Sequence, residues 1–194
     1  MKKLGRDFFD RDTLLVARDL LGKYLVRMWD GEPLVGRITE TEAYIGRCDK
    51  ACHAYGYRRT SRTETLFAPP GTAYIYLIYG MYHCLNFVTE PEGEPAAVLL
   101  RGLEPVAGLA RMSLNRFGKS PDALTPYQNK HFLDGPGKVC QALALTRAQN
   151  GLDLCGGELF LCDAGETPAV IHTSPRIGID YAQEAVHFPW RFYV

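Results

Sequence analysis

The segment TAYIYLIYGMYHCLNFV, residues 72–88, decides the fold. Aromatic and aliphatic residues fill it, a composition that favours β-strands. Gly80 and Met81 interrupt this pattern near its middle, where a tight turn can reverse the chain. The segment therefore predicts two strands around Gly80-Met81. Tyr74 and Tyr76 share one face of the first strand, because side chains alternate along a strand.

Tyrosine side chains also surround the predicted turn. Tyr79 and Tyr82 flank Gly80-Met81, so the tip of the hairpin presents aromatic rings. Exposed side chains on such a tip can insert between the bases of a nucleic acid. Tyrosine is also a common strand residue that simply packs against its neighbours, and the segment alone does not separate the two interpretations.

The flanking sequence predicts more strands. Residues 23–29 alternate, Asp30-Gly31 is a strong hairpin signal, and the partner strand runs from about residue 34 to 45. Residues 96–103 have the apolar run of a buried strand. Four short strands are predicted in the last third of the chain: ELFLCDA (158–164), AVIHT (169–173), RIGID (176–180) and WRFYV (190–194).

Helical signals are fewer. Predicted helices cover residues 10–21, ended by Gly22, residues 105–117, ended by Gly118, and residues 136–145. Pro105 and Pro136 suit the first position of a helix, where the missing N–H costs nothing. Residues 46–65 and 119–133 are predicted as loops. Successive strands lie too close in sequence for helical crossovers, so these elements predict one α+β domain over residues 1–194, built mostly on antiparallel sheet.

Composition narrows the class of protein. The chain has 22 basic and 22 acidic residues among 194, a balance that argues against a strongly basic nucleic-acid binder but permits charge gathered on one face. The N-terminus MKKLGRDFFDRD has no apolar signal segment, and no run is long enough to span a bilayer. A cytoplasmic protein whose six cysteines stay thiols is the expectation.

Two carboxylates stand on one predicted strand. In RITETEAY, residues 37–44, alternation places Glu40, Glu42 and Tyr44 on one face together with Ile38. Glutamate is a poor strand residue. A general base beside an aromatic platform is one interpretation; a solvated face whose carboxylates pair with basic residues across the sheet is the other.

The sequence gives little support for a metal-binding site. Cys48-Asp-Lys-Ala-Cys52-His53 resembles a ligand cluster, but three residues separate the cysteines where a haem attachment motif has two. No second ligand pair occurs at the spacing of a zinc site. We expect no metal and no cofactor.

Several blocks taken in order are similar to one known family. They are TEAYIG, the downstream His53, PPGTAYIYLIYGMYHCLN, AAVLLRGLEP, GPGKVCQALAL and RFYV. Together they run along almost the whole chain and resemble the alkyladenine (3-methyladenine) DNA glycosylases. The resemblance implies a mixed domain around a curved, mostly antiparallel, open-barrel-like sheet with peripheral helices, and a protruding β-hairpin that enters the minor groove of DNA.

The resemblance also implies roles for individual residues. Glu42 matches the general base that activates the attacking water, and Arg101 matches a residue that helps hold this water and the carboxylate. The base pocket would have Tyr44 as one wall and His53 and Tyr76 as the other. Rings on both sides attract a cationic alkylated purine.

Further matches concern selectivity and DNA contact. Asn86 matches the position that discourages guanine by clashing with its exocyclic amino group. Tyr79, with Met81 beside it, matches the wedge that fills the gap left by the extruded base. Gly137 and Lys138, at a predicted helix start, are candidates for a DNA phosphate contact, although a plain helix cap is an equal interpretation.

The implied enzyme is a monofunctional glycosylase of base excision repair that leaves an abasic site, because no lysine nucleophile is matched. Its partner is double-stranded DNA with damaged purines: 3-methyladenine, 7-methylguanine, hypoxanthine or ethenoadenine. We expect a monomer that binds no membrane and, in a bacterium, associates with the nucleoid. The alternatives are a non-catalytic lesion-binding DNA module, which would not need both Glu42 and Arg101, and an RNA-binding sheet, for which no RNP-like motif is present.

Overall fold

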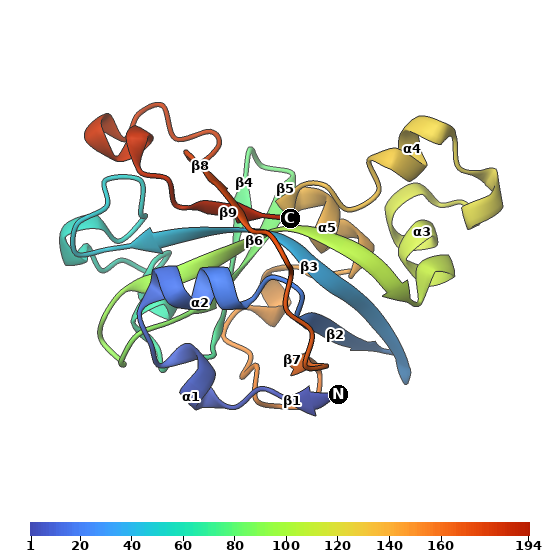
Figure 1. Ribbon diagram of the computed structural model, residues 1–194, viewed down its shortest axis with the longest axis horizontal. Coiled ribbons are helices and arrows are strands. Elements are labelled where there is room, and N and C mark those ends of the chain that lie inside the picture. The colour runs from blue at the N-terminus through green and yellow to red at the C-terminus, as the bar shows by residue number, and fades with distance from the viewer.

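The computed structural model describes all residues from 1 to 194 (Figure 1). Its strands are β1 (Lys2–Lys3), β2 (Tyr24–Trp29), β3 (Glu32–Ile45), β4 (Ala73–Ile78), β5 (Tyr82–Val88), β6 (Ala96–Ala107), β7 (Leu159–Asp163), β8 (His172–Ser174) and β9 (Arg191–Tyr193). Its α-helices are α1 (Arg6–Phe9), α2 (Thr13–Asp19), α3 (Leu109–Phe117), α4 (Pro126–Lys130) and α5 (Pro136–Ala142). Short 3₁₀ helices are η1 (Tyr55–Tyr57), η2 (Glu64–Phe67), η3 (Pro121–Ala123), η4 (Arg147–Gln149) and η5 (Gln183–His187).

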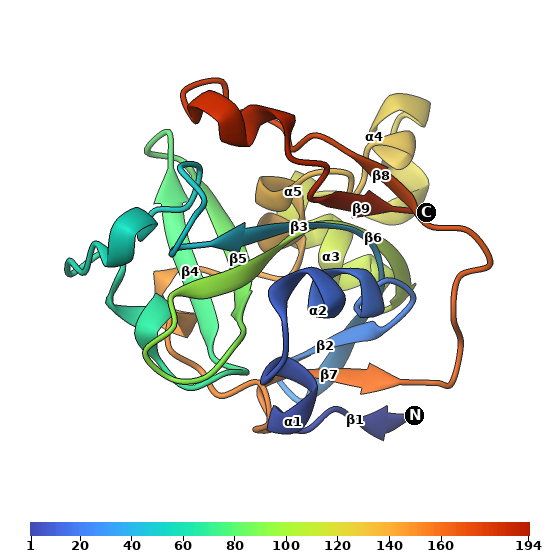
Figure 2. The same ribbon diagram turned by 60° about the vertical axis from the view of Figure 1, so that its left-hand side comes forward.

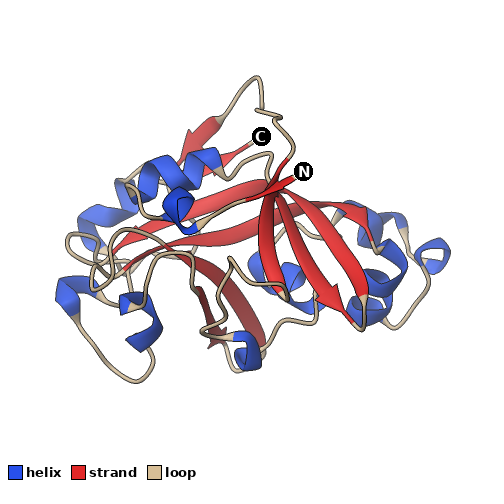
Figure 3. Cartoon of the chain, turned by 90° about the horizontal axis from the view of Figure 1, so that it is seen from below, coloured by secondary structure: helices blue, strands red, loops and turns tan.

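One antiparallel sheet organises the protein. Its strands follow the order β1-β7-β2-β3-β6-β5-β4, and β9 pairs with both β3 and β8. The sheet does not close into a barrel, since β1 and β4 lie at opposite ends of this order. Figure 3 shows the strands fanned out with the helices around them. The predicted α+β class with a mostly antiparallel sheet is confirmed.

Both predicted tight turns are present, and left-handed residues make them. Asp30 and Gly31 have φ of 47° and 81° between β2 and β3. Tyr79 and Gly80 have φ of 53° and 68° between β4 and β5. Two successive residues with positive φ give a turn whose twist matches that of the strands it joins. The β4–β5 hairpin stands out from the rest of the sheet in Figure 2.

Strand β3 changes face at a bulge. Ile38 pairs with Leu103 and Glu40 pairs with Gly102, so Thr39 is an extra residue on β3. Ile38 consequently joins the main buried core of 29 residues, while Glu40 turns to the opposite side. The prediction that Ile38 shares a face with Glu40, Glu42 and Tyr44 is therefore wrong, because a bulge reverses alternation.

Helix α2 covers the core side of β3. The Thr41 hydroxyl donates to the Ala17 carbonyl of α2 at 2.8 Å, and Thr41 and Ala43 have no exposed surface. The Asp12 carboxylate caps the helix by accepting from the N–H groups of Leu14 and Leu15. The opposite side of β3 is left for Glu40, Glu42 and Tyr44.

The predicted helix start at Pro105 is wrong. Strand β6 continues through Pro105 to Ala107, and Pro105 lies beside a second register shift, between Val35 and Gly36. A bulge tolerates proline because no ladder hydrogen bond is required of it there. Helix α3 begins only after Gly108, whose φ of 78° is left-handed.

Three other predictions fail, and the remaining elements differ at their ends. Residues 176–180 form no strand, the predicted loop 46–65 contains η1 and the start of η2, and the predicted loop 119–133 contains η3 and α4. The first predicted helix is shorter, as α2, and is preceded by the unpredicted α1. None of the helices is both long and apolar enough to cross a membrane.

Replacement of Gly108 should destabilise the fold more than replacement of Gly118. Both have left-handed φ, but a Cβ on Gly108 would lie 2.5 Å from Leu34 Cδ2, whereas nothing lies within 4 Å at Gly118. We expect Gly118→Ala to lower the free energy of unfolding by about 1 kcal/mol. Gly108→Ala should lower it by about 1–3 kcal/mol more, through overpacking. Urea unfolding measures both, and equal losses would show that the close approach to Leu34 carries no cost.

Candidate active site

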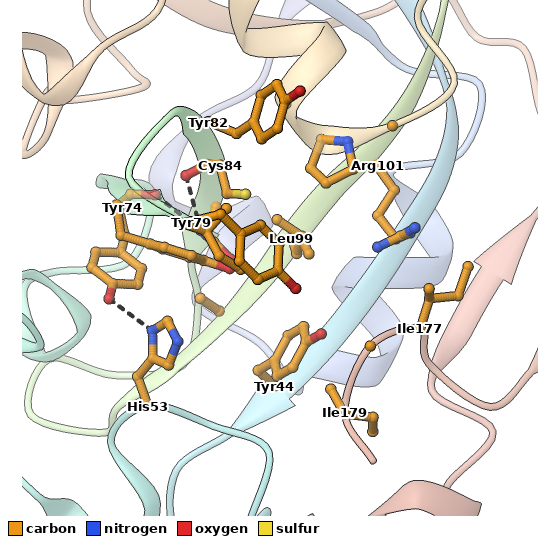
Figure 4. A pocket seen from close by; sticks show the side chains of 18 of the residues that line it. Tyr44, His53, Tyr74, Tyr79, Tyr82, Cys84, Leu99, Arg101, Ile177 and Ile179 are labelled. Atoms are coloured by element: carbon orange, nitrogen blue, oxygen red, sulfur yellow. Dashed lines mark hydrogen bonds between the residues drawn. The ribbon is translucent and has the colours of Figure 1, made fainter. Parts of the chain in front are cut away.

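A large cavity lies on the side of β3 opposite α2. It has a volume of about 730 Å³ and is lined by residues from β3, β4, β5, β6, the start of α5 and the segment before η5. Volumes of this size are typical of small-molecule sites. In Figure 4, Tyr44, His53 and Arg101 approach this space from different sides.

Glu42 lies immediately behind the cavity wall. Its side chain has no exposed surface, and it does not itself line the cavity. Its Oε2 accepts a hydrogen bond from the Tyr44 hydroxyl at 2.8 Å, and its Oε1 accepts one from the Ile177 N–H at 2.8 Å. The Arg101 Nε lies 3.5 Å from the same Oε1. Tyr44, Arg101 and Ile177 all line the cavity, so it borders the groups that hold the carboxylate.

Burial makes this carboxylate a stronger base than an exposed one. It raises the pKa of Glu42, and the positive charge of Arg101 and the hydrogen bonds from Ile177 and Tyr44 offset this only in part. Burial also raises the pKa of the Tyr44 hydroxyl well above its ordinary value, so Tyr44 keeps the proton that it donates. Each carboxylate oxygen retains a lone pair for one further donor.

Aromatic rings form much of the remaining wall. The centroids of His53 and Tyr76 are 4.6 Å apart, and the His53 Nδ1 lies 3.1 Å from the Tyr74 hydroxyl oxygen. The Arg62 guanidinium lies 3.5 Å from His53 Nε2. Because arginine only donates, Nε2 accepts and the ring proton resides on Nδ1. The structure thus brings together Tyr44, His53 and Tyr76 around one cavity.

Asn86 is held rigidly in the cavity wall. It is buried on β5, and its Nδ2 donates to the carbonyl oxygens of Tyr74 at 3.1 Å and Cys84 at 3.4 Å. Both donors come from the same amide nitrogen and both acceptors are main-chain atoms. The side chain therefore cannot turn away from an incoming ligand without losing two hydrogen bonds.

A buried ion pair connects Arg176, in the last part of the chain, to Asp49, close to the aromatic residues that line the cavity. Asp49 and Arg176 are joined by two hydrogen bonds of 2.5 and 2.8 Å, and neither side chain is exposed. The guanidinium also lies 4.6 Å from the centroid of the Tyr44 ring. Arg176 does not line the cavity, so it supports Tyr44 from behind. The following residues, Ile177 and Ile179, complete the wall.

The hairpin tip places apolar side chains at the mouth of the cavity. The exposed fractions of Tyr79 and Met81 are 79% and 64%. Tyr79 also contributes to the cavity lining. A tyrosine in the left-handed region of φ is uncommon. Tyr79 and Met81 are thus exposed at the hairpin tip, and their insertion into DNA stays a prediction.

Gly137 and Lys138 have contacts that a phosphate site would not need. A Cβ on Gly137 would lie 2.9 Å from the Tyr82 ring, so its absence lets α5 pack against the hairpin. The Lys138 ammonium is bound to the Asp134 carboxylate at 2.6 Å. Both residues line the cavity. Their phosphate contact stays a prediction.

No group of three or more His, Cys, Asp or Glu side chains lies close enough together to hold a metal ion. Cys48 is exposed, Cys52 is buried, and all six cysteines are free thiols.

Some of the residues around the cavity carry no signal in the sequence. Alternation places Tyr74 on the same face as Tyr76 but indicates no role for it. In the structure its hydroxyl oxygen lies within hydrogen-bond distance of His53 Nδ1. The pattern around Ile177 and Ile179 predicts a strand and nothing of their place in the wall. The Asp49–Arg176 pair joins residues 127 apart in sequence, which local patterns do not reveal.

A buried carboxylate beside an arginine, behind a cavity lined by aromatic rings, is an arrangement typical of hydrolases that use a general base. The comparisons with known proteins specify the family. The profile of the Methylpurine-DNA glycosylase (MPG) family matches residues 7–194. The chain therefore belongs to this family and is a DNA glycosylase of alkylation repair, a hydrolase of N-glycosyl bonds.

Similar proteins cover the whole chain. A protein of Clostridium perfringens named "Putative 3-methyladenine DNA glycosylase" is 51% identical over 99% of this chain and 95% of its own length. Proteins of the same name from Alkaliphilus oremlandii and Desulfitobacterium hafniense are 52% and 48% identical, over 99% and 100% of this chain and 95% and 96% of their own lengths.

His53 should remain uncharged far below neutral pH. Burial, and secondarily the charge of Arg62, lowers its pKa to about 4. A titration followed by NMR of the imidazole carbon-bound protons should show this midpoint, against about 6.5 for an exposed histidine. Arg62→Ala should raise the midpoint only in part, because burial is the larger cause. A midpoint near 6.5 in the unaltered protein would show that the ring is solvated.

Proposed function

We propose that this protein excises damaged purines from double-stranded DNA, with Glu42 activating the water that displaces the base. The observation that carries the proposal is the carboxylate of Glu42, buried beside Arg101 and behind a cavity of about 730 Å³. The protein acts as a monomer and leaves an abasic site.

Extrusion of the purine comes first. Tyr79 and Met81 enter the duplex and fill the gap, while the base passes into the cavity between Tyr44 on one side and His53 and Tyr76 on the other. Unstacking a base costs a few kcal/mol, and insertion of the wedge together with stacking in the cavity offsets this cost. A damaged and weakly paired base costs less to extrude.

Hydrolysis follows at the carboxylate. Water reaches Glu42 between Tyr44 and Arg101, the lining side chains nearest its oxygens, and gives its proton to the carboxylate as it attacks C1′. The bond from C1′ to the base breaks, and its electron pair leaves with the base. Positive charge develops on the sugar, so the same carboxylate stabilises the transition state electrostatically.

Selectivity combines two features of the cavity. Its aromatic faces attract a cationic alkylated purine. Asn86, fixed by two main-chain acceptors, discourages guanine through its exocyclic amino group. 7-Methylguanine carries the same amino group, but its positive charge gains the attraction of the aromatic faces, which offsets this cost. The expected substrates are 3-methyladenine, 7-methylguanine, hypoxanthine and ethenoadenine. Excision of the neutral bases requires their protonation, which makes it fall more steeply as pH rises.

Glu42→Gln should abolish most base release without loss of DNA binding. The amide keeps the size of the side chain but cannot take a proton, so the single-turnover rate should fall by a factor of about 100 to 10,000. The assay uses duplex oligonucleotides with hypoxanthine or ethenoadenine, and alkali-labile abasic sites report the product. A wild type that binds these duplexes and 3-methyladenine DNA tightly but releases no base would favour the non-catalytic lesion-binding module.

Tyr79→Ala should weaken binding of lesion-containing duplex. Loss of an aromatic ring stacked on a base costs about 1–3 kcal/mol, on the order of tenfold to a hundredfold in Kd. Tyr127 on α4 offers a matched control, since its exposed fraction of 72% is close to the 79% of Tyr79. Tyr127→Ala should leave Kd unchanged in fluorescence anisotropy. Equal effects of the two substitutions would contradict a wedge at the hairpin tip.

A further inference from the structure

Glu40 holds two arginines with one oxygen. Its Oε1 accepts from the Nε of Arg101 at 2.7 Å and from the Nε of Arg191 at 2.6 Å. The three side chains are between 13% and 22% exposed, so the cluster is largely screened from solvent. Arg191 also donates to the Ser174 hydroxyl at 3.2 Å, which anchors the cluster to β8.

The same nitrogen of Arg101 faces both carboxylates of β3. It lies 2.7 Å from Glu40 Oε1 but 3.5 Å from Glu42 Oε1. Hydrogen bonds from N–H to oxygen are about 2.7–3.2 Å long. Arg101 therefore gives its Nε–H to Glu40 and acts on Glu42 through its charge alone. Its two terminal nitrogens make no hydrogen bond within the protein and are left for the cavity, which Arg101 lines.

We propose that Glu40 is a positioning residue that keeps Glu42 basic by taking the Nε–H of Arg101. This inference rests on the proposed function, because it assigns Glu40 a part in the same hydrolysis. Without Glu40, Arg101 would hydrogen-bond Glu42 directly. A carboxylate bound in this way is a weaker base, and one of its lone pairs is no longer free for water.

Among the groups around Glu42, Arg101 is the one that can lower its basicity by donating a new hydrogen bond. The charged or titratable side chains that influence it from other elements are Arg101, Tyr76, Cys84 and Arg176. On its own strand, Tyr44 donates a hydrogen bond and Glu40 adds a negative charge. Burial and the charge of Glu40 raise the pKa of Glu42, and Arg101 lowers it. Removal of Glu40 should therefore lower the pKa of Glu42, because it takes away a repelling charge and frees the Arg101 Nε–H to donate.

The test uses the pH dependence of base release. A duplex with 7-methylguanine suits it, because a cationic base leaves without gaining a proton and the profile then reports the general base. The rate rises with pH as Glu42 ionises. In Glu40→Leu, which has no acceptor for the Arg101 Nε–H, this rise should move to lower pH by on the order of one unit. The plateau above it should fall about tenfold, because the weaker base transfers the proton less readily.

Arg191→Gln should move the rise in the opposite direction. Glu40 then keeps Arg101 as its single partner and its negative charge is less compensated, so Glu42 binds its proton more tightly and the rise shifts to higher pH. Glu104→Leu is the matched control, because Glu104 accepts from Arg37 at 2.9 Å between the same two strands but is far more exposed to solvent. It should change nothing.

Opposite shifts in the two variants support the inference, since loss of stability alone would lower the rate without moving the profile in opposite directions. If the rate of base release rises at the same pH in the wild type and in the Glu40 and Arg191 variants, the inference is overturned, whatever the height of the plateau. If the wild type releases no base from this duplex, the proposed function is contradicted and the inference falls with it. Affinity for lesion duplex, expected to be unchanged in all three variants, confirms that each is folded.

Discussion

The buried carboxylate of Glu42 is the constraint on which the site depends. Removing a carboxylate from water costs several kcal/mol unless other groups replace its hydration. Tyr44 supplies one hydrogen bond from β3, Ile177 supplies another from the segment before η5, and Arg101 supplies a compensating charge from β6. The segment that carries Ile177 is far from β3 in sequence, so the carboxylate is satisfied only once the whole sheet has formed. This requirement links the geometry of the site to the completed fold.

Strand β3 can bury the Glu42 carboxylate beside the cavity because its two faces contact different parts of the protein. On one face, Thr41 and Ala43 pack toward α2 and contribute to the interior. On the other, Glu40, Glu42 and Tyr44 reach the cavity side. The bulge at Thr39 separates this stretch from Ile38, which belongs to the core. A regular strand would have put Ile38 among the carboxylates. The bulge therefore keeps both Ile38 and Ala43 in the core, while Glu40, Glu42 and Tyr44 lie on the cavity side.

Local sequence patterns predict the features of the fold that depend on residues close together in the chain. Both hairpins follow from turn residues that accept positive φ, Asp30-Gly31 in the first and Gly80 in the second, and the shared face of Glu40, Glu42 and Tyr44 follows from alternation. Local patterns do not reveal the bulges, so they predict the wrong face for Ile38 and a helix start at Pro105. Nor can they show that Arg176 pairs with Asp49, 127 residues away, or that the irregular residues after it line the cavity. The family resemblance supplies the roles of the pocket residues, which alternation alone leaves open.

The balance of charges bears on how selectivity would arise. A glycosylase with a large positive excess binds any duplex through release of counterions, which carries no information about damage. This chain has equal numbers of acidic and basic residues. Under the proposed function, a larger part of its affinity must then come from insertion of Tyr79 and from stacking in the cavity. Both are gained only when a base is extruded, and extrusion is cheapest for a damaged base. Weak general attraction to DNA would in this way favour the lesion over the normal duplex.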